Sequence, residues 1–189
     1  KEVPAGYRDP KFSFMKGDTI ASIGNGLADR MQHDGWMETL LQDQHSDLGL
    51  KFRNMSLTGD RVNKFPRSKG FTPHDRYLEH IKADVIFAFF GYNESFDTRP
   101  EDYTKQLEEM IAKFRGLQPS GKSPRIVLFS PIAHEDTGNR NLPNGVSNNQ
   151  RLAALTEATK QAAETAGVTF VDLFNPSKAL YRANSEPLT

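Results

Sequence analysis

Apolar runs alternate with amphipathic segments along the chain. Five runs are predicted strands: Asp18–Gly24, Leu50–Ser56, Ala83–Gly91, Pro124–Pro131 and Val168–Phe174. The intervening helical patterns cover Leu27–Gln44, Pro73–Lys82, Pro100–Leu117 and Asn148–Gly167. The run "ADVIFAFFG" is apolar almost throughout, as in a parallel strand that is covered on both faces. This alternation predicts an α/β fold, a three-layer α/β/α sandwich around a five-stranded parallel sheet.

The first helix is expected to be continuous. Its apolar positions Leu27, Met31, Trp36, Leu40 and Leu41 are spaced to form an inner face. Trp36 and its neighbour Met37 are therefore interpreted as core or partly buried residues and not as a binding platform. The chain's last residues, "NSEPLT", carry no helix signal and are expected to form a polar loop.

Composition and charge argue against several classes of partner and site. The 189 residues include 24 basic and 24 acidic side chains, so the net charge is zero and neither a nucleic-acid nor a membrane-surface partner is expected. The longest apolar run, "VIFAFFG", is too short to span a bilayer. The chain has no cysteine, which excludes disulfides, thiolate metal sites and cysteine nucleophiles.

Polar residues follow four of the predicted strands. They are Gly24-Asn25-Gly26, then Ser56, Thr58, Gly59 and Asp60, then Gly91–Ser95, and finally Ser130–Asp136. The carboxyl ends of parallel strands meet at one edge of the sheet, where such folds bind their ligands. We therefore expect the functional site at this edge, although loops are commonly polar for other reasons.

The turn "GNGLAD" permits two interpretations. It matches G-x-G-x-x-G at two of three glycines, but Asp29 stands at the third, and the second strand ends without the acidic residue that would hold a ribose. A dinucleotide site is therefore disfavoured. The alternative is a turn that presents a nucleophile.

On that interpretation the chain resembles the SGNH hydrolases, also called the GDSL esterase/lipase family. The family's first strand is followed by Gly-Asp-Ser, and here the triplet is Gly24-Asn25-Gly26, so Gly26 stands where the family has its nucleophile. The second-block glycine matches Gly59, and G-x-N-D matches Gly91-Tyr92-Asn93-Glu94. The family's His-bearing last block is expected beyond Thr189. We thus expect residues 1–189 to form a single domain truncated before that segment and its helix.

The resemblance implies a flavodoxin-like sheet of order 2-1-3-4-5 and an esterase-like activity on acyl or acetyl esters, including esters on carbohydrates. It also implies oxyanion donors at the N–H groups of Gly26 and Gly59 and at the Asn93 amide. Glycine has no side chain with which to attack. The second hypothesis is therefore a non-catalytic, hydrolase-derived domain that binds a ligand or carbohydrate.

Displaced chemistry is a third possibility at the same edge. Ser95, Ser56 or Thr58 could replace the nucleophile, or His134 or Glu135 could act as base toward water. Metal binding by His134, Glu135 and Asp136 is disfavoured because no second histidine is in register. Thr19, in "GDTIA", lies at the wrong end of its strand to act as the nucleophile.

Four further residues are predicted to contact substrate: Asn25, Arg53, Asn54 and Glu94. For Arg53, an ion pair with Glu94 or Asp60 is an equally good expectation. The basic run Arg61–Lys69 is interpreted as a solvated loop.

The segments "GDTIASIGNGLADRMQHDGW" and "VLFSPIAHED" resemble one SGNH subgroup, which is found in large secreted proteins of planctomycete-type bacteria. That resemblance implies an extracytoplasmic location and other domains of the same polypeptide as partners. Subgroup members often carry a haem-binding Cys-x-x-Cys-His module, which this cysteine-free chain lacks. We therefore expect no cofactor and no metal here.

Overall fold

The computed structural model describes residues 12–66, 70–184 and 186–189. Its five parallel strands form one sheet of order β2-β1-β3-β4-β5. The strands are β1 (Thr19–Gly24), β2 (Lys51–Asn54), β3 (Val85–Phe89), β4 (Arg125–Phe129) and β5 (Thr169–Val171). The predicted three-layer α/β fold and its strand order are confirmed, and β3 is buried at every position.

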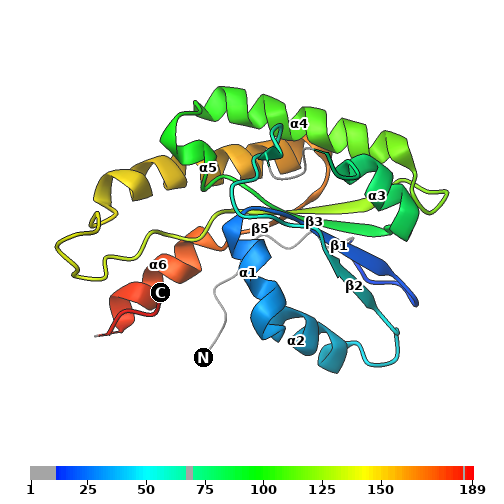
Figure 1. Cartoon of the computed structure of the whole chain (residues 1–189), viewed down its shortest axis with the longest axis horizontal. Coiled ribbons are helices and arrows are strands. Elements are labelled where there is room, and N and C mark those ends of the chain that lie inside the picture. Colours follow the sequence, from blue (N-terminus) through cyan, green and yellow to red (C-terminus); the bar gives the residue numbers. More distant parts are fainter. Residues whose placement is uncertain (1–11, 67–69, 185) are drawn as a thin grey trace.

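Helices cover both faces of the sheet (Figure 1). They are α1 (Gly26–Asp34), α2 (Trp36–Gln44), α3 (His74–Ile81), α4 (Pro100–Leu117), α5 (Val146–Ala166) and α6 (Phe174–Ala183), with a 3-10 turn η2 (Glu94–Phe96) after β3. In Figure 1, α3, α4 and α5 lie above the sheet and α1, α2 and α6 below it.

The core has two halves because strand side chains alternate between the sheet's faces. On β3, Ile86 and Ala88 pack with residues of α3, α4 and α5. Val85, Phe87 and Phe89 pack on the opposite face, against residues of β1, α1 and α2. The two halves hold the sheet rigid, and with it the loops at its carboxyl edge.

The expected continuous first helix is wrong. It divides at Gly35, which has a left-handed φ of 62° and forms the C-cap of α1. The bend changes which residues face inward: Met37 packs against the core, whereas Trp36 is 69% exposed and Leu40 is 54% exposed. The predicted inner positions Leu27 and Met31 of α1 pack against the core, but of those predicted in α2 only Leu41 does.

The region of the fifth strand also differs from expectation. The predicted fifth strand, Val168–Phe174, is shorter, and its last residue begins the unexpected helix α6. Phe174 is buried with Leu152 and Ala133, so α6 is held by packing against the edge of the sandwich. Leu173, the residue before α6, forms no side-chain cap, but Asp172 Oδ1 accepts the N–H of Asn175 at 3.0 Å. This capping aspartate lies inside the predicted fifth strand, which concealed the start of the helix.

Candidate functional site

A pocket of about 720 Å³ opens at the carboxyl edge of the sheet. Its walls come from the β1–α1 turn, the β2–α3 connection, the end of β3 and the segment after β4. Among the lining residues are Asn25, Gly26, Leu27, Arg30, Thr58, Phe89, Phe90, Tyr92, Asn93, Ser130, Pro131, Ile132, His134, Glu135, Leu142 and Thr189. Apolar side chains with a few polar groups among them are typical of a small-molecule site.

The β1–α1 turn begins with a glycine that the fold requires. Gly24 has a φ of 146°, and a Cβ there would lie 2.2 Å from the carbonyl oxygen of Phe89. Asn25 then caps α1: its side chain accepts from the N–H of Leu27, while its own N–H donates to Phe89 O. Asn25 lines the pocket, but its side-chain oxygen is already engaged in capping.

Gly26 is different from Gly24. Its backbone is not in the left-handed region, and a Cβ would find Thr58 Oγ1 at 3.6 Å, which is an ordinary contact. The position could therefore carry a side chain. Gly26 is the first residue of α1, whose leading N–H groups lack partners within the helix.

Asn93 lines the pocket beside the β2–α3 connection. Its Nδ2 donates to the carbonyl oxygen of Asp60 at 2.9 Å, which leaves one amide hydrogen for a ligand. Gly59 has a φ of 98° and lies next to Thr58, but it is not among the residues that line the pocket. The three expected oxyanion positions are thus in neighbouring loops, with Gly26 and Asn93 at the pocket itself.

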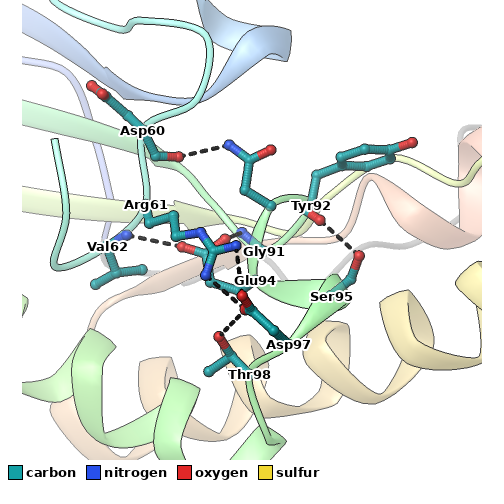
Figure 2. A network of polar contacts seen from close by, with 10 residues as sticks. Asp60, Arg61, Val62, Gly91, Tyr92, Glu94, Ser95, Asp97 and Thr98 are labelled. Atoms are coloured by element: carbon teal, nitrogen blue, oxygen red, sulfur yellow. Dashed lines mark hydrogen bonds and ion pairs between the residues drawn. The ribbon is translucent and has the colours of Figure 1, made fainter. Parts of the chain in front are cut away.

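Glu94 holds these loops together and does not contact the pocket, contrary to its expected substrate-binding role. It is fully buried, and its two oxygens accept from the N–H groups of Val62 and Gly91, each at 2.9 Å (Figure 2). Burial raises the pKa of Glu94, and these hydrogen bonds oppose the rise. Beside it, Arg61 pairs with Asp97 through two contacts of 2.6 and 3.1 Å.

The serines proposed as displaced nucleophiles are out of reach. Ser95 is buried, and its hydroxyl lies within hydrogen-bond distance of Tyr92 O and Asn148 Oδ1 (Figure 2 shows the first contact). Ser56 is buried as well, and neither serine lines the pocket. The structure therefore does not support either serine as a displaced nucleophile, because loop position alone does not tell which way a hydroxyl points.

His134 lines the pocket, but its hydrogen bonds do not suit a base. Nδ1 lies 3.4 Å from Tyr92 Oη and 3.3 Å from Asn148 Nδ2. Burial raises the pKa of Tyr92, so its phenol remains a donor at neutral pH. Asn148 Nδ2 can only donate, so in the neutral ring Nδ1 accepts and Nε2 carries the proton.

Glu135 is also engaged. Its carboxylate accepts from the N–H of Leu188 at 2.8 Å and from the N–H and hydroxyl of Thr189 at 2.7 and 2.6 Å. Burial tends to raise the pKa of Glu135, but the hydrogen bonds from Thr189 and Leu188 outweigh it and lower the pKa. The group therefore anchors the segment 186–189 at the pocket wall instead of acting as a free base.

Arg53 and Asn54 lie away from the pocket, so their predicted contact with substrate is not supported. Arg53 is exposed on β2 and donates to Phe52 O, without the ion pair expected with Glu94 or Asp60. Asn54 ties β2 to α1 by donating to Ala28 O at 2.6 Å. His74, and not Arg53, lies beside Asp60, with its Nε2 3.8 Å from Asp60 Oδ2.

Three pocket features were missed. Arg30 and Tyr92 line the cavity, and Asp29 lies beside it, bound to the Thr58 hydroxyl at 2.6 Å. Positions 26, 29 and 30 share one face at the start of a helix, so helical spacing could have identified Asp29 and Arg30. The predicted basic loop Arg61–Lys69 lies partly outside the described residues, and its Arg61 is paired.

The described residues, 12–66, 70–184 and 186–189, offer neither a metal cluster nor a membrane-spanning helix. They contain no group of three or more His, Asp or Glu side chains placed to hold a metal ion. Within the same ranges, every helix is too short or too polar to cross a membrane.

Solved structures of similar fold include several esterases and lipases. A GDSL-like lipase candidate from Parabacteroides merdae shares 16% identity at a TM-score of 0.69, over 92% of this chain and 85% of that one. Axe2, an acetylxylan esterase from Geobacillus stearothermophilus, shares 18% identity at a TM-score of 0.64, over 90% and 82%. LAE5, an alpha/beta hydrolase enzyme from the metagenome of Lake Arreo, Spain, shares 17% identity at a TM-score of 0.68, over 92% and 84%.

Sequence comparison gives the family. The curated proteins contain no significant match to the chain. The profile of the GDSL-like Lipase/Acylhydrolase family, in contrast, matches residues 16–188, which is nearly the whole sequence. The chain therefore belongs to the GDSL-like lipase/acylhydrolase family.

Proposed function

We propose that this chain binds an acyl or acetyl ester, borne by a small molecule or a carbohydrate, and acts on it as an esterase-like hydrolase without the usual serine at position 26. The observation that carries the proposal is that Gly26 and Asn93 both line one apolar-walled pocket of about 720 Å³. Their N–H and amide groups can donate to an ester carbonyl oxygen, and such donors stabilise the oxyanion of acyl transfer.

The acetylxylan esterase neighbour supports acetylated carbohydrate as the ligand to test first. At 18% identity the likeness carries the fold alone, so the ligand remains our proposal. The second hypothesis, a non-catalytic binding domain, is favoured by the missing side chain at Gly26. We also propose an extracytoplasmic location, with other domains of a larger polypeptide as partners, on the strength of the planctomycete-type resemblance.

The test is calorimetric titration with an acetylated xylo-oligosaccharide and with the same oligosaccharide after deacetylation. We expect binding of the acetylated form only, weakened about three- to tenfold by Asn93→Ala through the loss of one hydrogen bond. Arg53→Ala, outside the pocket, is the control. Equal binding of both oligosaccharides, or an unchanged affinity in Asn93→Ala, would refute the proposed ester site.

A further inference from the structure

We propose that Thr58 is the nucleophile that replaces the missing serine, with Asp29 as its general base. The inference rests on the proposed function, because it needs an ester bound in the pocket. It adds a catalytic pair that the family's Gly-Asp-Ser arrangement does not contain.

The Thr58 hydroxyl lies beside the position that a side chain at residue 26 would occupy. A Cβ on Gly26 would be 3.6 Å from Thr58 Oγ1. Thr58 lines the pocket and is exposed, unlike Ser95 and Ser56. With no side chain on Gly26, Thr58 Oγ1 is open to a carbonyl carbon bound beside the N–H groups that begin α1.

Asp29 is placed to take the proton. Thr58 Oγ1 donates to Asp29 Oδ2 at 2.6 Å, and the N–H of Thr58 donates to the same oxygen at 2.9 Å. The other carboxylate oxygen accepts from Gln32 Nε2 at 2.7 Å. These contacts fix the carboxylate on the hydroxyl, which is the geometry that a nucleophile and its base require.

Other hydroxyls at the pocket suit the task less well, and that of Thr137 has no carboxylate partner among the described residues. Ser130 is 1% exposed and accepts the N–H groups of Leu173 and Phe174. Thr189 also donates to a carboxylate, that of Glu135, but the same carboxylate oxygen takes the Thr189 N–H and anchors the segment 186–189. Of the two threonine–carboxylate pairs, only that of Thr58 adjoins the Gly26 turn.

The chemistry balances over two steps. Thr58 Oγ1 attacks the ester carbonyl carbon as its proton passes to Asp29, and the oxyanion receives hydrogen bonds from Gly26 N–H and Asn93. Collapse breaks the bond to the alcohol oxygen, which leaves with the proton from Asp29. Water then attacks the acyl-Thr58 ester, with Asp29 again taking and returning the proton, and releases the carboxylic acid.

The experiment measures 4-nitrophenyl acetate hydrolysis and, by mass spectrometry of peptides from the quenched reaction, the site of acetylation. We expect acetyl on Thr58 in the parent. Turnover should fall to the buffer rate in Thr58→Val and by about a hundredfold or more in Asp29→Asn, which loses the base. Thr58→Ser should retain turnover. Thr98→Val is the matched control, because Thr98 also contacts an aspartate, Asp97, but lies outside the pocket.

The outcomes separate this inference from the proposed function. Full turnover in Thr58→Val, or acetyl on Thr189 or another residue instead of Thr58, would overturn the inference. Absence of turnover in a parent that still binds acetylated xylo-oligosaccharide would also overturn it and leave the binding domain standing. If the parent neither binds nor turns over, both proposals fail. Circular dichroism of each variant, with Asp29→Asn and Thr58→Ser as mild substitutions, separates lost chemistry from lost fold.

Discussion

Two glycines of one turn differ in what they contribute. Gly24 is required by the backbone, because its φ is 146° and a Cβ would overlap Phe89 O. Gly26 is under neither constraint, since the nearest atom to a Cβ would be at 3.6 Å. The fold around position 26 therefore does not require the glycine that stands there.

This difference predicts opposite responses to substitution. Gly26→Ser should change the free energy of unfolding by less than about 1 kcal/mol, because the helix start accepts a side chain there. Gly24→Ala should cost roughly 2 kcal/mol or more through the backbone clash. Urea unfolding of both variants checks this. Equal destabilisation by the two would contradict the distinction.

Glu135 predicts a pH dependence. Its pKa is lowered in the folded protein below the ordinary value of 4.5, so the unfolded state binds more protons as pH falls. Its contribution to stability is therefore complete above pH 4.5 and is lost as pH drops through the folded pKa. Urea unfolding of the parent and Glu135→Gln across pH 3 to 7 should show a difference that shrinks on acidification. A difference independent of pH would contradict the assignment.

At the scale of elements, three polar contacts join the β2–α3 connection to the turn after β3. They are Asn93 to Asp60 O, Glu94 to Val62 N–H, and Arg61 to Asp97 (Figure 2 shows the latter two). Of the three, only the Glu94 contact is fully buried. Glu94 therefore sets the spacing of the loops that carry Gly59 and Asn93.

Glu94→Gln tests that role. The amide has one acceptor oxygen, so its NH₂ group would face a backbone N–H, and we expect a loss of roughly 2–4 kcal/mol in unfolding free energy. Amide hydrogen exchange at Val62 and Gly91 should accelerate more than at core positions of β3. The exposed Glu79→Gln, which loses only a surface pair with Arg76, should cost little. Unchanged hydrogen exchange at both amides would show that Glu94 does not hold the two loops together.

Element boundaries depended on the glycines and the packing around them. Gly167, where the predicted helix Asn148–Gly167 ends, is the C-cap of α5 and has a left-handed backbone, with φ of 59°. Gly35 divides the first predicted helix for the same conformational reason. The apolar residues on its two sides fit the spacing of one continuous helix, so the sequence did not reveal the break. α6 begins inside the predicted fifth strand, where Asp172 Oδ1 accepts the N–H of Asn175 and Phe174 is buried against the sandwich.

At the scale of the molecule, one sheet lies between two apolar layers. Strand β3 contributes to both, with Ile86 on one face and Phe87 on the other. Losing either layer would expose the shared sheet. We therefore expect one cooperative thermal transition, with calorimetric and van't Hoff enthalpies in a ratio near one. Two resolved transitions, or a ratio well above one, would contradict a single folding unit.

The sequence by itself determined the architecture and which residues lie at the carboxyl edge of the sheet. Alternating apolar runs and helices dictate a parallel sheet, and parallel strands bring the residues that follow them to one edge. The lack of a side chain at Gly26 is likewise readable without coordinates. Each of these features depends on the local residue pattern or on the direction of the chain, and both can be read from the sequence.

Only the tertiary structure decided which polar groups at that edge are available. Ser95, Glu94 and Glu135 have their polar atoms engaged by distant segments, and Arg53 faces solvent. Thr58 and Asp29 meet across 29 positions of sequence and stand beside Gly26. Side-chain direction and burial depend on contacts between loops far apart in the chain, and sequence spacing does not record them.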